Sequence, residues 1–161
     1  MENRIYGYVR ISTKKQSIER QIRNIKAPYP TAVIVEEIYT GTSIDRKEWN
    51  KLAKRVVQGD TIVFDSVSRM SRNAQDGFEI YEELYSRGVD LVFLKEPHIN
   101  TETYKTALAN NIKLTGTNVD FILEGINKYL FSLAKEQIRL AFEQAEKEVK
   151  DLLEKELKPQ D

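Results

Sequence analysis

Four short apolar runs that alternate with amphipathic helical patterns constrain the fold of this chain more than any other feature. The runs cover residues 4–9, 31–39, 61–64 and 89–94, and helical patterns fill the intervals between them. Such alternation is typical of βαβ units, which build a mostly parallel sheet with helices on both faces. The third run is apolar throughout, as expected for a strand buried on both faces. The sequence therefore predicts a three-layer α/β/α fold.

The ends of the helical patterns carry boundary signals. Pro28 stops the first pattern, and Asp45 with Glu48 three residues later resembles a capping box at the start of the second. Asn73 is the expected N-cap of the third pattern, and Gly88 is the expected residue just after its end.

Basic and hydroxyl residues follow the first and third apolar runs. Arg10 and Ser12 stand at the end of the first run, and Arg69 and Arg72 lie in an expected loop over residues 66–72. Ligands of parallel α/β sheets bind beyond the carboxyl ends of the strands. We therefore expect these two segments, far apart in sequence, to meet at one edge of the sheet.

A continuous helical pattern runs from residue 119 to residue 157, with no glycine after Gly125 and no proline before Pro159. At about 1.5 Å per residue such a helix spans roughly 55 Å, which is longer than a domain of this size. Its apolar stripe consists of Ile122, Ile126, Tyr129, Leu133, Ile138, Ala141, Ala145, Val149 and Leu152. The stripe predicts self-association. The alternative is a first half packed on the domain and a second half that frays. We expect a domain over residues 1–118 and a dimerisation helix with its tail over 119–161.

Composition limits the classes of function. The formal net charge is zero, so a nucleic-acid partner would have to be recognised by local clusters. One such cluster, six bases with a single acid, includes Arg10, Lys14, Lys15, Arg20, Arg23 and Lys26. It is either a solvated face or a surface that steers DNA. The absence of cysteine excludes disulfides and cysteine-containing zinc sites. With no signal-peptide pattern or long apolar run, a soluble intracellular protein is expected.

Five sequence blocks in a defined order resemble the catalytic domain of serine recombinases, the resolvase/invertase superfamily. The blocks are Gly-Tyr-Val-Arg-Ile-Ser-Thr at 7–13, Gln21, Gly41 with Asp-Arg-Lys at 45–47, Gly59-Asp60, and Arg-Met-Ser-Arg at 69–72. The spacing matches through about residue 95 and more loosely in the long helix. Residues 133–145 look most like large serine recombinases of Gram-positive mobile elements.

The resemblance implies a reaction. A serine attacks a phosphodiester of double-stranded DNA, releases a 3′-hydroxyl and leaves a 5′-phosphoserine link. Homodimers form a synaptic tetramer, exchange strands and rejoin them by the reverse step. The phosphoserine retains the ester bond, so rejoining needs no ATP. No metal and no other cofactor is expected, and arginines would stabilise the developing charge. The implied setting is the bacterial cytoplasm.

The resemblance also assigns residues. Ser12 is the nucleophile, and the remaining catalytic candidates are Arg10, Gln21, Arg46, Arg69 and Arg72. The substrate-binding candidates are Lys14, Ser68 and Arg139. Taken alone, Ser12 could be a helix N-cap, Arg10 a surface strand residue, and Gln21 part of a polar helix face.

This sequence departs from the family pattern at two positions. Ser68 stands where the family usually has an aspartate, a candidate proton donor to the leaving oxygen. Ser68, an arginine or water could take that part. The long helix of the family commonly has an arginine after glutamate, but here Gln137 follows Glu136. Whether Arg139 replaces that arginine is left open.

Three further interpretations stand beside this assignment. Family members normally carry a DNA-reading region after the long helix, and none is evident before Asp161, so a catalytic fragment or truncated product is expected. The alternative function is a catalytically impaired resolvase-like module for assembly or regulation. An unrelated flavodoxin-like phosphate-binding protein is the weaker third reading.

Overall fold

The computed structural model describes residues 2–11, 15–38, 46–71 and 73–157, and within them it contains a four-stranded parallel sheet. The strands are β1 (Ile5–Ile11), β2 (Val33–Ile38), β3 (Thr61–Phe64) and β4 (Asp90–Phe93). Their order is β2-β1-β3-β4, and every neighbouring pair is parallel. The prediction of a parallel α/β sheet is confirmed.

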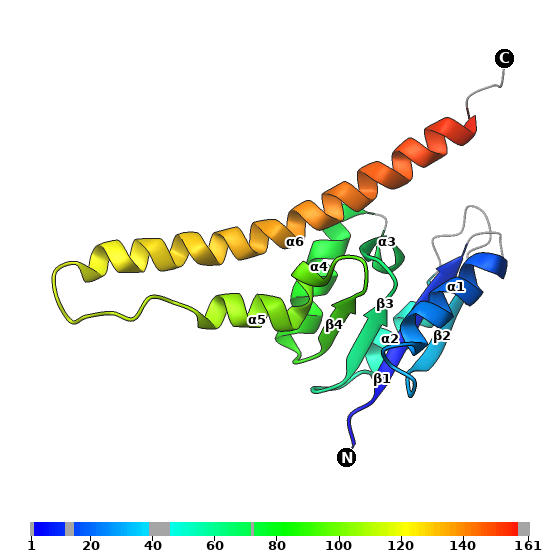
Figure 1. Cartoon of the computed structure of the whole chain (residues 1–161), viewed down its shortest axis with the longest axis horizontal. Helices are drawn as coiled ribbons and strands as arrows, with labels where there is room; N and C mark the ends of the chain where they lie inside the picture. Colours follow the sequence, from blue (N-terminus) through cyan, green and yellow to red (C-terminus); the bar gives the residue numbers. More distant parts are fainter. Residues whose placement is uncertain (1, 12–14, 39–45, 72, 158–161) are drawn as a thin grey trace.

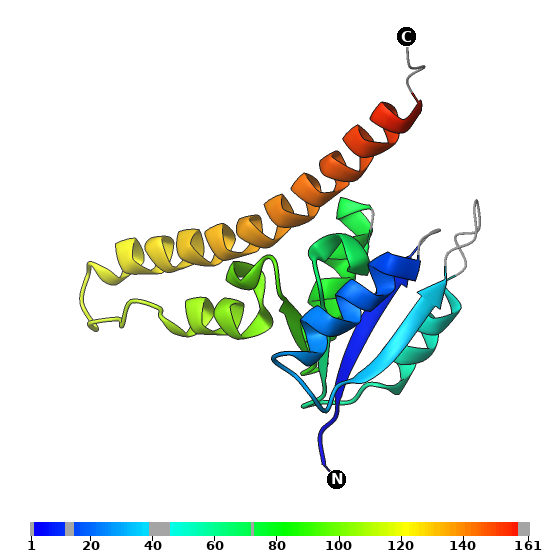
Figure 2. The ribbon, with the colours of Figure 1, turned by 45° about the vertical axis from the view of Figure 1, so that its right-hand side comes forward.

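Helices cover both faces of the sheet, as Figures 1 and 2 show. Helix α1 (Lys15–Lys26) packs on one face, where Ile25 meets Val9 and Val63. Helices α2 (Lys47–Arg55) and α4 (Ala74–Ser86) pack on the other. The larger core there includes Tyr8, Phe64, Trp49 and Tyr81. Successive residues of a strand point to opposite faces, so β1 contributes to both clusters.

Local boundaries agree with the sequence signals at some points and differ at others. The side chain of Asn73 accepts a hydrogen bond from the Asp76 amide at 3.0 Å, so the predicted cap of α4 is confirmed. Gly88 has a φ of 78°, the left-handed conformation expected after a helix. The predicted cap Asp45 lies outside the described residues. Arg46 is the N-cap of α2, and its side chain makes no capping bond.

The segment after β3 is not simply the expected loop. Residues Val67–Met70 form a short helix, α3, at the carboxyl end of the strand. Four residues are too few to show a helical period in the sequence. The short helix brings the backbone of Ser68 back toward β1, where the Ser68 carbonyl accepts a hydrogen bond from Nη2 of Arg10.

The long helix α6 (Asp120–Leu157) is continuous over 38 residues and crosses the outside of the domain (Figure 1), as predicted. Its middle docks on the core, where Ile138 and Phe142 are each 1% exposed. A Cβ at Gly77 of α4 would lie 2.5 Å from Cδ1 of Phe142, so this close approach requires glycine. Ile126 and Tyr129, nearer the start, are exposed. The middle of the helix, rather than its first half, therefore packs on the domain.

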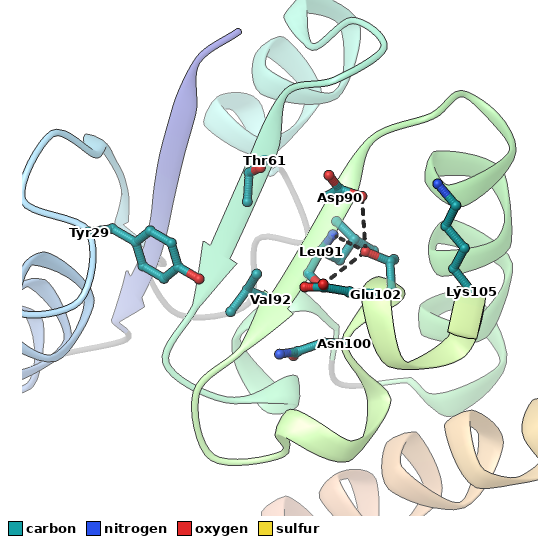
Figure 3. A pocket seen from close by; sticks show the side chains of 9 residues that line it. Tyr29, Thr61, Asp90, Leu91, Val92, Asn100, Glu102 and Lys105 are labelled. Atoms are coloured by element: carbon teal, nitrogen blue, oxygen red, sulfur yellow. Dashed lines mark hydrogen bonds between the residues drawn. The ribbon is translucent and has the colours of Figure 1, made fainter. Parts of the chain in front are cut away.

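The outer edge of β4 is covered by side chains from the segment that follows it, 3-10 helix η1 (Pro97–Ile99) and helix α5 (Thr101–Ala109). The amide of Leu91 donates to Oγ1 of Thr101 at 2.9 Å, and that of Phe93 to Oδ1 of Asn100 at 2.7 Å. These bonds protect an edge strand from further pairing. Figure 3 shows the adjoining hollow of about 400 Å³, at the end of the sheet where β3 and β4 begin.

Within the described part of the chain, no helix is long and apolar enough to cross a membrane.

Candidate active site

At the end of β1, a side chain and not a strand forms hydrogen bonds with the backbone. The pairing of β1 with β3 ends at Tyr8, whereas its pairing with β2 continues to Ile11. Beyond Tyr8, the amide of Arg10 donates to Oε1 of Gln21, and Nε2 of Gln21 donates to the Arg10 carbonyl, both at 3.1 Å. Gln21 is 1% exposed, so the interpretation of Gln21 as part of a solvated helix face is wrong.

Arg10 also joins β1 to α3. Its Nη2 donates to the carbonyl of Ser68 at 2.8 Å, and Nη1 of Arg69 donates to the carbonyl of Arg10 at 3.4 Å. The predicted meeting of the two segments at one edge of the sheet is thereby confirmed for Arg10 and Arg69. Ser12, Lys14 and Arg72 lie outside the described residues.

Arg46 lies over the aromatic side chains next to this junction. Its guanidinium carbon is 5.6 Å from the centre of the Tyr8 ring and 5.1 Å from that of Trp49, and Nη2 donates to the Tyr8 hydroxyl at 3.3 Å. Tyr8 and Arg10 are two residues apart on one strand, so they share a face of the sheet. Arg46 therefore stands on the face to which Arg10 belongs. Its Nε is buried and has no hydrogen-bond partner among the described residues.

Tyr8 and Glu37 add two buried titratable groups to this corner. Burial raises the pKa of the Tyr8 hydroxyl, and the charge of Arg46 opposes that rise. Burial also raises the pKa of Glu37, against the hydrogen bond from the Glu48 amide and the charge of Arg46. Glu37 is 3% exposed and accepts that amide bond at 2.9 Å. Arg46 is thus the cation that both groups face.

Sequence patterns point only weakly to a role for Tyr8 and Glu37 in the site. The usable signal for Tyr8 is its two-residue spacing from Arg10. The position of Glu37 depends on the register of β1 against β2, which a single sequence does not reveal.

Ser68 is engaged through both its hydroxyl and its backbone. Its Oγ lies 2.8 Å from Oγ of Ser66, and its carbonyl accepts the bond from Arg10. Before α3, the buried carboxylate of Asp65 accepts from Nδ2 of Asn24 at 3.0 Å and pairs with Nζ of Lys95 at 3.4 Å. Side chains from β1, α1 and the segment after β4 therefore hold the chain from Asp65 to Ser68.

Arg139 lies on α6 beside the amino end of α4. Its Nη1 is 3.5 Å from a carboxylate oxygen of Glu136, and its guanidinium carbon is 5.3 Å from the centre of the Phe78 ring. With Asn73 and Glu146 it lines a hollow of about 310 Å³. The structure thus places Arg139 against α4, whereas Arg10, Gln21, Ser68 and Arg69 are joined by hydrogen bonds.

Among the described side chains, no group of three or more histidine, aspartate or glutamate residues is arranged to hold a metal ion.

Guanidinium groups at the carboxyl edge of a parallel sheet are typical of α/β proteins that bind phosphate. The sequence matches the family described as "Resolvase, N terminal domain" over residues 5–150, and the chain belongs to this family. The resemblance to serine recombinases is confirmed at this level.

Curated relatives agree with the assignment. The Tn3 transposon resolvase of Escherichia coli is 33% identical over 97 residues, which cover 58% of this chain and 51% of that protein. A resolvase of Clostridium perfringens is 29% identical over 99 residues, covering 60% and 52%. The chain spans about half the length of these curated relatives. A resolvase family site-specific recombinase from Streptococcus pneumoniae superimposes with a TM-score of 0.48 at 19% identity, covering 98% of this chain and all of that one.

Proposed function

We propose that this domain cleaves and rejoins double-stranded DNA at specific sites through a 5′-phosphoserine formed on Ser12. The observation that carries the proposal is the junction of Arg10 with α3, two residues before Ser12 in a chain of the resolvase family. That junction gathers guanidinium groups at the carboxyl edge of the sheet, where ligands of parallel α/β folds bind.

In the proposed reaction, Oγ of Ser12 forms a bond to phosphorus and the bond from phosphorus to the 3′-oxygen breaks. The hydroxyl proton of Ser12 leaves, and the 3′-oxygen takes up a proton to become a hydroxyl. In the rejoining step, the 3′-hydroxyl of the new partner strand attacks the phosphoserine and releases the serine. No ATP is required, because one ester is exchanged for another.

The arginines stabilise the charge that builds on the phosphoryl oxygens. A guanidinium offers paired donors that match two phosphate oxygens, which an ammonium group cannot do. Arg10, Arg46 and Arg69 take this part, together with Arg72 from outside the described residues. Gln21 acts through Arg10, since its amide fixes the backbone of that residue. Lys14, Ser68 and Arg139 contact DNA near the cleaved bond.

The exposed start of α6 supports an assembly of several copies. Phe121, Ile122, Ile126, Tyr129 and Leu133 are all exposed on this helix. Apolar side chains in such number on one projecting helix favour burial against a second copy. We propose residues 1–118 as the catalytic domain and 119–161 as the dimerisation helix with its tail, with two dimers forming a tetramer on DNA in the bacterial cytoplasm.

One observation favours a second function. Ser68 stands at the position where the resemblance implies an aspartate, and its hydroxyl is bound to that of Ser66. A domain without that acid could serve in assembly or regulation without cleaving DNA.

Trapping of the covalent intermediate separates the two functions. The protein is incubated with its DNA site, nicked opposite the bond to be cut. We expect a covalent 5′-phosphoprotein that disappears in Ser12→Ala and remains in the neighbouring control Thr13→Ala. An adduct that persists in Ser12→Ala would overturn the assignment. No adduct with the native protein bound to its site would favour the assembly module.

A further inference from the structure

Helix α3 carries Ser68 and Arg69, yet it has little stability of its own. It comprises four residues, and its N-cap, Ser66, makes no side-chain capping bond. A single helical turn gains too few hydrogen bonds to offset the entropy of ordering it. Its position must therefore depend on groups from elsewhere in the fold.

Glu96, which follows β4, supplies such a group. The amide of Val67, the first residue of α3, donates to both carboxylate oxygens of Glu96, at 3.0 and 3.3 Å. The neighbouring Lys95 donates its amide to the carbonyl of Asp65 at 3.1 Å. The segment after β4 therefore binds the chain on both sides of Ser66, where it enters α3.

The carboxylate of Glu96 lies in a partly buried position that disfavours its ionised form. Burial raises the pKa of Glu96, while the Val67 amide and the charges of Lys95 and His98 oppose the rise and Glu148 adds to it. Perturbed pKa values cluster at functional sites. The hydrogen bond of Glu96 to α3 indicates what that function is.

We propose that Glu96 is a positioning residue of the active site, which holds the first turn of α3 so that Ser68 and Arg69 meet Arg10. The chain of contacts is continuous. Glu96 accepts from the amide of Val67, the next residue offers its carbonyl to Arg10, and Arg69 reaches the carbonyl of Arg10 in return. This inference rests on the proposed function for its effect on cleavage, although the contact itself can be tested without DNA.

The first test is hydrogen exchange of the backbone amides in the full chain without DNA. In Glu96→Ala we expect the Val67 amide to exchange about tenfold faster or more, because a charge-assisted bond is lost. Glu96→Gln retains an acceptor and should keep most of the protection. Glu148→Ala is the matched control. Glu148 and Glu96 both line a hollow between α6 and the segment after β4, but Glu148 accepts its hydrogen bond from Gln144 within α6. Unchanged exchange at Val67 in Glu96→Ala would overturn the proposal.

The second test is the rate of single-turnover cleavage at saturating DNA. Glu96→Ala should slow the formation of the covalent adduct by about tenfold or more while DNA affinity changes little. Glu96→Gln should restore most of the rate, and Glu148→Ala should leave it unchanged. A slowed rate with normal Val67 exchange, or weaker DNA binding at a normal rate, would contradict the positioning role.

One outcome separates this proposal from the proposed function. If the native protein forms no adduct but Val67 loses protection in Glu96→Ala, the proposed chemistry fails and the anchor on α3 stands.

If Glu96→Ala does not fold, Glu96→Asp replaces it. The shorter side chain of aspartate keeps the charge but moves the carboxylate oxygens away from the Val67 amide. Full protection of Val67 in Glu96→Asp would count against the anchor.

Discussion

Gln21 forms two hydrogen bonds with the backbone of Arg10, one to the amide and one to the carbonyl, each 3.1 Å long. The amide group thereby replaces the strand that would otherwise pair with β1 beyond Tyr8, where β3 has ended. The geometry ties α1 to the strand end that carries Arg10. The guanidinium of that residue points toward α3, where its Nη2 donates to the carbonyl of Ser68.

Replacement of Gln21 by methionine should destabilise the domain. Methionine has a similar length but would leave the amide and carbonyl of Arg10 with one partner fewer each, at a buried site. We expect a loss of about 1–3 kcal/mol in the free energy of unfolding, measured with urea. Arg23→Gln, an exposed change on the same helix, should stay within about 0.5 kcal/mol of the native value. Equal stabilities for Gln21→Met and the native chain would contradict this account of the strand end.

The pH dependence of stability should reveal the burial of Glu37. Its folded-state pKa lies above the ordinary value of 4.5, so between the two values the folded state binds more protons than the unfolded state. Stability contributed by this group therefore falls as pH rises through that window. Glu37→Gln does not titrate and keeps an acceptor for the Glu48 amide.

The difference in unfolding free energy, Glu37→Gln minus native, should accordingly increase as pH rises above 4.5 and become constant at higher pH. Urea unfolding of both proteins over a series of pH values measures it. A difference that stays flat, or that decreases with rising pH, would show that burial does not raise the pKa of Glu37 in the folded state.

The docking of α6 on α4 depends on Gly77. A Cβ at this position would meet Cδ1 and Cε1 of Phe142 at 2.5 and 2.7 Å, so Gly77→Ala must separate the helices or displace a buried ring. We expect a net loss of about 1–3 kcal/mol in unfolding free energy, despite the better helix propensity of alanine.

Gly125→Ala is the control for this prediction, because a Cβ at Gly125 meets no described atom within 4 Å. That change should raise stability by up to about 1 kcal/mol through helix propensity alone. Similar effects of the two substitutions would mean that the close approach of Phe142 is not maintained in solution.

A sulfur substitution in the DNA can test the consequence of Ser68. If proton donation to the leaving oxygen is weak, DNA with sulfur in place of the bridging 3′-oxygen should be cleaved faster than ordinary DNA, since a thiolate leaves without a proton. Ser68→Asp should raise the rate on ordinary DNA, by up to about 10²-fold, and have little effect on the sulfur-containing strand.

Ser66→Ala is the control here, because it removes the partner of the Ser68 hydroxyl and leaves the Ser68 carbonyl bond to Arg10 in place. The measurement is the rate of adduct formation on both DNA substrates. Equal gains for Ser68→Asp on the two substrates would argue that the aspartate acts through structure and not as an acid.

The layer order and the sheet edge of the site could be predicted because they depend on patterns within single segments. The apolar run Thr61–Phe64 indicated a strand buried on both faces, and the rule for parallel sheets then placed Arg69 near Arg10. The structure bears out both inferences. The continuous helix α6 followed in the same way from the absence of glycine after Gly125 and of proline between that residue and Pro159.

Side-chain contacts between distant segments that no topological rule covers could not be predicted. Helical periodicity places Gln21 among polar neighbours, and nothing local shows that its amide completes a strand. The four residues of α3 are too few for a period, and the anchor from Glu96 joins positions 29 residues apart. The docking of α6 through Phe142 depends on a glycine in α4, which only the packed structure reveals.

The central claim, that Ser12 is the nucleophile, is tested most directly by locating the covalent bond to DNA. After trapping on a nicked site and digestion with nuclease and trypsin, the linked nucleotide should be found by mass spectrometry on a peptide that begins after Arg10 and ends at Lys14. The account predicts a phosphodiester on Ser12 within this peptide. A nucleotide on Thr13, on Ser66 or Ser68, or on any other residue of the chain would contradict it.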